Sequence, residues 1–381
     1  MKKRILALAT VVLMIFTVPL YSFAEDGTPA ASYRQDGEQT QTANELFYVK
    51  GTLDYSEASD VLTIVNKERR AAGLPALTMD VELQQAAMQR AAETALYFSH
   101  ERPDGTSCFT VSNRAFGENI AAGQNSAKLV MKSWMRSQGH RENILRSNFA
   151  SIGIGCFYQK NGTKCWVQLF GGDDAQTVAA GRGTKQSTFT IQAVPGRIKP
   201  YLQSSSTMTV AKGKTTSFSV YIRNQGWSYL SVKAEPQTFR WTSSNSNVSV
   251  NTSGTITGKK QGSATIRASL PVSGQTVSRK VTVEAAPKKA ALRSVKTGNR
   301  TLKVTWKRNK KASGYQVLIA RNKKFTKGKK RATISKNRTT SKTFKKLKRK
   351  KVYYVKVRAY KKVGGSKLYG SYSKVKRVKV K

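Results

Sequence analysis

Apolar residues in the first part of the chain recur every three to four positions, a spacing that predicts helices. Residues 152–170 alternate between apolar and polar instead, and they turn at Asn161-Gly162, which predicts an antiparallel hairpin. Helices followed by such a hairpin indicate a layered α/β domain of roughly 130 residues. The three expected helices cover residues 56–73, residues 80–98 with Asp80 as N-cap, and a stretch that begins at Ser126.

Helical spacing disappears in the second half of the chain. Short runs there alternate between apolar and polar residues, and clusters of Ser, Asn, Gly and Lys separate them. Alternation buries one face of a strand and leaves the other in water, so two successive all-β sandwiches are expected. The clearest of these runs are residues 264–270, 302–306, 315–319 and 353–359.

The first residues are typical of a secretory signal peptide. A basic start at Lys2, Lys3 and Arg4 precedes an apolar run over 5–18, and cleavage is expected after Ala24. The run is shorter than the roughly 20 residues that a spanning helix needs, so no transmembrane anchor is expected after cleavage. The expected organisation is a signal peptide (1–24), a linker and lead-in (25–55), an α/β domain (56–175), a linker (176–189) and two β-sandwiches (190–285 and 286–381).

The charged residues are distributed very unevenly along the chain. Residues 45–175 carry fourteen basic and fourteen acidic side chains, whereas residues 286–381 carry thirty-six Lys or Arg and no Asp or Glu. A field of that strength concentrates polyanions near the surface. Anionic cell-wall or matrix polymers are therefore the expected partners, with a solubilising lysine coat as the alternative. Nucleic-acid binding is not expected of an exported protein.

Three cysteines, Cys108, Cys156 and Cys165, leave room for one disulfide outside the cytosol. Cys156 and Cys165 flank the turn at Asn161-Gly162 and so are one candidate pair. A Cys108–Cys156 disulfide is the other, and it is the one we favour. Cys108 is interpreted as structural rather than as a nucleophile.

Both histidines of the chain, His100 and His140, lie in the neutral domain, with Glu118 between them in sequence. Two imidazoles and a carboxylate suit a zinc ion with an open coordination position, and they equally suit an acid–base pair. The alternative is that each histidine satisfies a local hydrogen bond. The spacing of the three residues does not choose among these interpretations.

Residues 57–171 resemble the CAP superfamily of cysteine-rich secretory, antigen 5 and plant pathogenesis-related proteins, in its bacterial SCP-domain form. The motifs that carry the resemblance are Val65-Asn66-Lys67-Glu68-Arg69, Gly73-Leu74-Pro75, Phe98-Ser99-His100, Gly117-Glu118-Asn119-Ile120, Gly139-His140-Arg141 and Trp166-Val167-Gln168-Leu169-Phe170.

The resemblance implies an α-β-α sandwich with a large cleft. In many members the cleft holds two histidines and two acidic residues, and some of these bind a divalent metal such as zinc. His100, Glu118 and His140 match three of the four positions. Ser137 falls near the fourth, where a carboxylate is missing. Glu142 is either a substitute for that carboxylate or a solvated helix residue, and we favour the second interpretation.

The two basic segments also resemble known modules. Residues 190–285 are similar to bacterial Ig-like domains of group 2, through Trp241-Thr242-Ser243 and Gly262-Ser263-Ala264. Residues 286–381 are similar to fibronectin type III domains, through Trp306 and through Tyr353 at the position of the tyrosine corner. Such modules imply a secreted or cell-surface protein.

These observations predict a secreted binding protein whose cleft takes a small apolar ligand or a divalent metal. A metal-assisted hydrolase of peptides or esters, using His100, Glu118 and His140, is the first alternative. An adhesive protein with a vestigial cleft is the second. The missing fourth acid favours the non-enzymatic interpretation.

Overall fold

The computed structural model describes residues 43–381 except 174, 204, 206, 225, 228, 229 and 364. The expected signal peptide and the first part of the expected linker lie outside these residues. None of the helices in the described part of the chain is long and apolar enough to cross a membrane.

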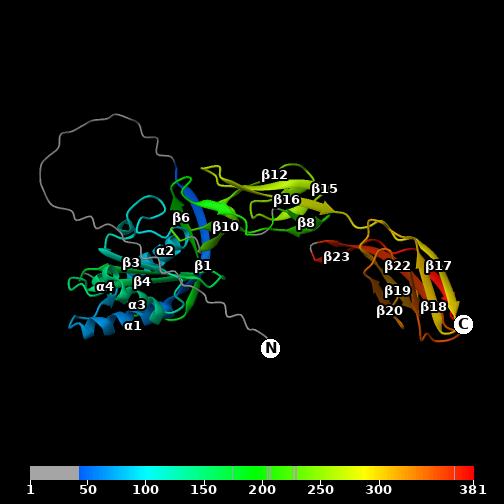
Figure 1. Ribbon diagram of the computed structural model, residues 1–381, viewed down its shortest axis with the longest axis horizontal. Coiled ribbons are helices and arrows are strands. Elements are labelled where there is room, and N and C mark those ends of the chain that lie inside the picture. Colours follow the sequence, from blue (N-terminus) through cyan, green and yellow to red (C-terminus); the bar gives the residue numbers. More distant parts are fainter. Residues whose placement is uncertain are drawn as a thin grey trace, which may run out of the picture. The chain divides into compact units, whose positions relative to one another are not determined.

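The first domain is a three-layered α-β-α sandwich (Figure 1). Its sheet has the strand order β3-β5-β4-β1-β6, and β2 pairs with β4. Helix α2 covers one face, and α1 and α3 lie on the other. The elements are β1 (Glu45–Asp54), α1 (Tyr55–Ala71), β2 (Thr78–Met79), α2 (Val81–Leu96), the 3-10 helix η1 (Cys108–Val111), β3 (Gly117–Ala122), α3 (Ala127–Arg136), α4 (Gln138–Ile144), β4 (Ser151–Tyr158), β5 (Lys164–Gly171) and β6 (Thr184–Ala193).

Side-chain caps start the three long helices where the sequence predicts them. Asp54 accepts a hydrogen bond from the backbone of Glu57, and Asp80 accepts one from Leu83. Ser126 does the same for Leu129 at the start of α3. Two glycines let α2 approach the sheet, since a Cβ on Gly153 or Gly155 would lie 2.0 Å from a carbonyl oxygen of that helix.

Two strands of this sheet come from segments that the sequence analysis assigns to linkers. Strand β1 lies in the expected lead-in, and β6 begins inside the expected linker 176–189. The two strands pair antiparallel along their whole length, from Glu45 opposite Ala193 to Asp54 opposite Thr184. Each strand thus supplies the backbone partners that the other lacks.

The expected disulfide is wrong, because all three cysteines are free and buried. The register of the hairpin explains this for one pair. Cys156 lies opposite Trp166, and Cys165 lies opposite Phe157. Since successive side chains of a strand alternate between faces, Cys156 and Cys165 point to opposite sides of the sheet. The favoured partner, Cys108, lies in η1, outside the hairpin.

In the second module, the elements formed by the described residues are strands and one short 3-10 helix. Its sheets have the orders β11-β10-β7, β12-β15-β16-β8 and β13-β14-β9. The elements are β7 (Lys199–Tyr201), β8 (Thr207–Ala211), β9 (Thr215–Thr216), β10 (Val220–Arg223), β11 (Ser231–Ala234), η2 (Pro236–Thr238), β12 (Arg240–Ser243), β13 (Val248–Val250), β14 (Ile256–Gly258), β15 (Gly262–Ser269) and β16 (Thr276–Glu284).

The third module is a β-sandwich with its own core. A three-stranded sheet, β17-β18-β21, faces a second sheet of order β20-β19-β22-β23, in which β24 also pairs with β22. Trp306 and Tyr315 are fully buried in the core and contact each other. The hydroxyl of Tyr353 accepts a hydrogen bond from the Lys348 backbone at 3.2 Å, as expected of a tyrosine corner. The strands are β17 (Leu292–Gly298), β18 (Thr301–Trp306), β19 (Gly314–Ala320), β20 (Lys330–Ile334), β21 (Ser341–Phe344), β22 (Val352–Val363), β23 (Ser366–Tyr369) and β24 (Lys376–Lys379).

Candidate functional site

A buried carboxylate lies at the centre of the candidate site. Glu118 is on β3, and its side chain is only 1% exposed. Its Oε1 accepts a hydrogen bond from Nε of Arg90 at 2.8 Å, and its Oε2 lies 2.8 Å from Nδ1 of His100. Both oxygens therefore have a charged or polar partner, as a buried carboxylate requires.

Arg90 connects this carboxylate to a second one. The guanidinium lies on α2, is fully buried, and donates to Oε2 of Glu93 at 2.9 Å. It also donates to the carbonyl of Ser99 at 2.9 Å, next to His100. Arg102 completes the cluster with a 2.6 Å ion pair to Glu93. Two guanidinium groups thus face the two buried carboxylates, and a third carboxylate, that of Asp104, lies 3.9 Å from Arg102.

This arrangement shifts the acidity of Glu118 in a definite direction. Burial alone would raise the pKa of the carboxyl, but the hydrogen bond from His100 and the charge of Arg90 lower it below its usual value. Glu118 is therefore ionised at neutral pH. A carboxylate that already has both oxygens engaged is better suited to orienting His100 than to removing a proton from a substrate.

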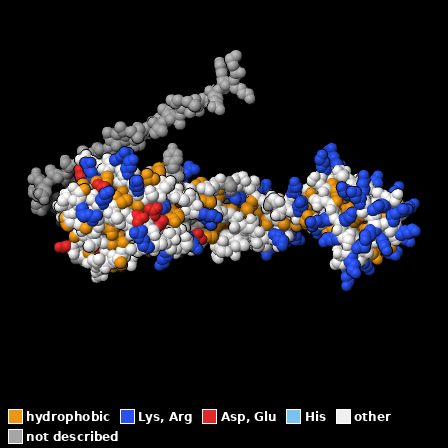
Figure 2. Space-filling model, turned by 90° about the horizontal axis from the view of Figure 1, so that it is seen from below, with side chains coloured by type: hydrophobic (Ala, Val, Ile, Leu, Met, Phe, Trp, Pro, Cys, Tyr) orange, Lys and Arg blue, Asp and Glu red, His pale blue; other side chains and the backbone are white. Residues whose placement is uncertain are grey.

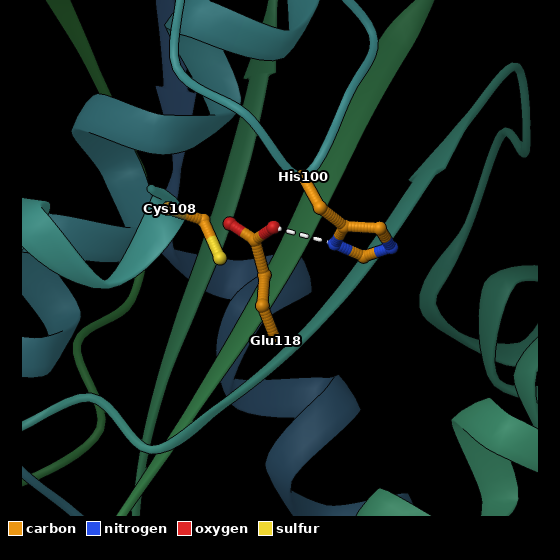
Figure 3. A group of neighbouring side chains, drawn as sticks. All are labelled: His100, Cys108 and Glu118. Carbon is orange, nitrogen blue, oxygen red and sulfur yellow. Dashed lines mark hydrogen bonds and ion pairs between the residues drawn. The ribbon is translucent and has the colours of Figure 1, made fainter. Parts of the chain in front are cut away.

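Cys108 lies beside the same carboxylate. Figure 3 shows Glu118 between the sulfur of Cys108 and the imidazole of His100, and the ligand atoms of these three residues all lie within 4.8 Å of one another. Burial, together with the negative charge of Glu118, raises the pKa of the Cys108 thiol to about 11. The thiol is thus protonated at neutral pH, which argues against a nucleophilic role.

These three residues form a possible metal-binding group of the described chain. Its donor chemistry fits a metal only in part. The thiol would have to lose its proton, and Glu118 would have to release Arg90 or His100. The guanidinium of Arg90 also places a fixed positive charge where a cation would bind.

His140 approaches the site from α4. Its backbone carbonyl accepts a hydrogen bond from Asn119, the residue after Glu118, at 3.0 Å. Burial and the proximity of His100 lower the pKa of His140, so its imidazole is neutral at pH 7. The structure thus brings His100, Glu118 and His140 to one region from a loop, a strand and a helix.

The two remaining candidates differ in position. Ser137 lies at the start of α4 and lines a pocket beside His140. Glu142 is exposed and accepts a hydrogen bond from Gln138, one turn earlier on the same helix, at 2.9 Å. Glu142 therefore has the surroundings of a solvated helix residue.

The pocket beside His140 has a volume of about 350 Å³. Most of its lining is apolar, and none of the lining residues in the described chain carries a carboxylate. Two of the lining residues, Gly226 and Trp227, belong to the second module. The remaining lining residues are Phe98, Ile120, Ala121, Ala122, Gln124, Ser133, Trp134, Ser137 and His140.

Sequence reasoning missed two features of this site. Arg90 was not singled out, although an arginine three residues before a glutamate within the alanine-rich stretch 86–95 is a signal for a buried ion pair. Trp227 was also missed, since nothing local relates it to residues about a hundred positions earlier. Cys108 was noticed, but as a disulfide partner.

Comparison with known protein families agrees with this architecture. The model of the cysteine-rich secretory protein family, CAP, matches residues 62–170. The bacterial Ig-like domain of group 2 matches residues 202–283, and the fibronectin type III domain matches residues 285–374. The chain carries a CAP domain followed by an Ig-like and a fibronectin type III module. Together the three matches account for most of the described residues.

Individual proteins are similar to parts of the chain. The chain is 38% identical over 118 residues to the uncharacterized protein YkwD of Bacillus subtilis, and the match covers 29% of this chain and 45% of that protein. The chain thus spans less than half the length of this curated relative.

Two solved structures are also similar. One is an extracellular protein containing an SCP domain from Bacillus anthracis, with 26% identity, a TM-score of 0.28, and coverage of 32% of this chain and 41% of that one. The other is an outer surface protein from Borrelia burgdorferi, with 20% identity, a TM-score of 0.28, and coverage of 30% of this chain and 90% of that one.

Proposed function

We propose that this is an exported binding protein whose CAP cleft takes a small apolar ligand, with a divalent metal position beside it. The basic modules retain the protein at an anionic cell wall or matrix. The observation that carries the binding role is the pocket at His140, which is lined mostly by apolar side chains and has no carboxylate in its described lining. Such a lining favours binding of an uncharged molecule over hydrolysis of a peptide or ester.

The metal position is proposed at the two imidazoles. With Nδ1 of His100 bound to Glu118, its Nε2 is available for a metal, and the His100 side chain is 59% exposed. His140 is the second ligand, held neutral at pH 7 by its surroundings. Glu118 would orient His100 rather than bind the ion, a common arrangement around metal-bound histidines.

Calorimetric titration of the full chain with zinc at neutral pH tests this position. We expect one ion per chain, with binding lost in both His100→Ala and His140→Ala. Cys108→Ser is the matched control and should leave binding unchanged. If Cys108→Ser abolishes binding while His140→Ala does not, the ion lies in the His100–Cys108–Glu118 group instead. No binding by the wild-type chain would remove the metal from the proposal.

A metal-assisted hydrolase is the second candidate, because the His100–Glu118 pair resembles the carboxylate–histidine pairs that serve in acid–base catalysis. An ester and peptide panel tests it. Hydrolysis by the pure wild-type protein that disappears in His140→Ala would favour this candidate over the binding role. Hydrolysis that survives the substitution would indicate a contaminating enzyme.

Retention at a surface rests on the charge of the third module. Lys and Arg side chains cover much of the face of this module that is visible in Figure 2. The module has no Asp or Glu side chain to neutralise its thirty-six cations. Lys361 forms an ion pair with Glu284 of the second module at 2.6 Å. The third module has no carboxylate side chain of its own that a polyanion would have to displace, and binding should weaken steeply as salt increases.

A further inference from the structure

Asn224 of the Ig-like module forms hydrogen bonds with the CAP domain at the end of α2. The side chain of Asn224 is buried and donates to the carbonyl oxygens of Thr94 and Ala95, at 2.8 and 3.0 Å. Its Oδ1 accepts a hydrogen bond from the backbone of Phe98 at 3.1 Å. Asn224 therefore satisfies backbone groups that the end of a helix leaves without partners.

The same Oδ1 also fixes the residues that follow Asn224. It accepts hydrogen bonds from the backbone nitrogens of Gly226 and Trp227, both at 2.9 Å. A Cβ on Gly226 would lie 2.1 Å from the carbonyl oxygen of Phe98, so only glycine permits this close approach. The position of Trp227 is thus determined by hydrogen bonds and by steric fit.

The indole of Trp227 forms one wall of the pocket beside His140. It packs over Gly123, where a Cβ would lie 2.6 Å from a ring carbon. Its ring centroid is 6.0 Å from that of Phe98, with the two planes tilted by 50°. Two aromatic rings from two different modules therefore line the same pocket, a surface suited to flat apolar groups.

One polar atom of the lining lacks a partner. Oε1 of Gln124 is buried and accepts no hydrogen bond from the described residues. A buried acceptor without a donor costs free energy, and a ligand hydroxyl or N–H would remove that cost. The amide nitrogen of Gln124 already lies 3.4 Å from the hydroxyl of Ser133, so the oxygen is the atom of this amide that still needs a donor.

We propose that the CAP pocket is a composite site, completed by Trp227 of the Ig-like module, for a neutral ligand with a flat apolar ring system and one hydrogen-bond donor. The ring lies against Trp227 and Phe98, and the donor bonds to Oε1 of Gln124 after the amide turns toward the pocket. This inference rests on the proposed function, since it specifies the apolar ligand and adds a specificity-determining residue from a second module.

Two probes of equal ring size test the site. 2-Naphthol has a flat ring and a hydroxyl donor, whereas 2-methoxynaphthalene has the same ring and no donor. Fluorescence titration of the full chain should give at least tenfold tighter binding of 2-naphthol. Trp227→Ala should weaken both probes about tenfold, and Trp227→Phe should weaken them less than threefold because a ring remains. Gln124→Met should abolish the difference between the probes.

Control variants separate this inference from the proposed function. Ser133→Trp fills the pocket from an exposed position of the CAP domain and should remove binding of both probes. Phe116→Ala removes a 62% exposed aromatic outside the pocket and should leave both affinities unchanged. Thermal unfolding of each variant verifies that it is folded.

The outcomes are distinct. If Ser133→Trp removes binding but Trp227→Ala and Trp227→Phe both bind as the wild type does, the site belongs to the CAP domain alone. The composite site is then refuted and the proposed function stands. If Gln124→Met retains the preference for 2-naphthol, the donor contact is refuted. If the wild-type chain binds neither probe, both the composite site and the apolar ligand of the proposed function are refuted.

Discussion

The CAP domain and the fibronectin module differ in the partners of their positively charged side chains. In the CAP domain, Arg90 is fully buried and faces two carboxylates, with N–O distances of 2.8 and 2.9 Å. In the fibronectin module no side-chain carboxylate exists. There Lys356 lies 3.9 Å from the ring centroid of Phe325, and Arg358 lies 3.7 Å from that of Tyr369. At these two cations, aromatic faces take the place of acidic partners.

The difference separates two uses of charge. Buried, paired charges fix the geometry of a few atoms, since each pair is held in one arrangement by its hydrogen bonds. The opposite charges of a pair also largely cancel, so the pair creates little electric field at a distance. Exposed cations without acidic partners fix little geometry and create a long-range field. The pKa of Lys356 is lowered by burial and by its neighbour Arg358, a sign that these cations repel one another. An anion bound at this surface would relieve that repulsion.

The largest expected effect comes from breaking the buried cluster. Glu118→Gln removes one of the two charges that neutralise Arg90, so we expect the free energy of unfolding to fall by about 3 kcal/mol. Chemical denaturation at pH 7 measures this. Glu142→Gln, the same change at an exposed helix position, is the control and should cost less than about 0.5 kcal/mol. Equal losses in the two variants would show that the cluster contributes no special stability.

A buried polar group without charge should matter somewhat less. Asn224→Ala leaves backbone groups of α2 and of its own loop without partners, for an expected loss of about 2 kcal/mol. The backbone nitrogen of Trp227 should also lose its hydrogen bond to Asn224, which faster hydrogen exchange of the Trp227 amide would detect. Asn251→Ala, which removes an asparagine from an exposed turn of the same module, should cost clearly less.

Acidification should weaken the CAP domain in two steps. The pKa of His140 is lower in the folded protein than its ordinary value of 6.5. The contribution of His140 to stability is therefore complete above pH 6.5, and it declines as the pH falls toward the pKa of the folded state. The pKa of Glu118 is also lowered, so a second loss follows below about 4.5. Denaturation midpoints measured between pH 8 and 3 check both steps. His140→Gln should lack the first step and retain the second.

Removal of exposed cations from the fibronectin module, the most highly charged module, should have the smallest effect on stability. Replacing the exposed residues Lys348, Arg349 and Lys351 together by Gln should change the free energy of unfolding by less than about 0.5 kcal/mol. Retention on a phosphocellulose column should nevertheless decrease, with elution at clearly lower salt, because the field that holds the polyanion is weaker.

A matched control removes the same charge from the CAP domain. The exposed residues Lys128, Lys132 and Arg136 of α3 are replaced by Gln. We expect a smaller change in the eluting salt concentration from this variant. If both triple variants elute at the same salt, retention depends on total charge and not on the fibronectin module.

Local patterns were sufficient for the elements whose partners lie nearby in sequence. The helix expected over 80–98 is α2 at Val81–Leu96, and the hairpin expected over 152–170 is β4 and β5. A capping aspartate and an Asn-Gly turn are signals that act within a few residues. Both cysteine pairings were wrong. The Cys156–Cys165 alternative depends on a register, which a one-residue shift reverses, whereas the favoured Cys108–Cys156 pair joins two segments that are distant in sequence.

Features formed between distant segments were not predictable from one sequence. Glu118 was singled out, but its partner Arg90 lies 28 residues away on another element. Trp227 reaches the pocket from a different module, and β1 finds its partner about 140 residues later in β6. Such contacts depend on the packed fold rather than on spacing, so a sequence pattern cannot specify them.

The pairing of β1 with β6 sets an order for the folding of the chain. During synthesis, residues 45–54 emerge long before residues 184–193, so β1 has an unpaired edge until the polypeptide has grown well past the CAP family match. A recombinant fragment that ends at residue 175 keeps that exposed edge permanently and should associate through it. A fragment extended through residue 193 contains both strands.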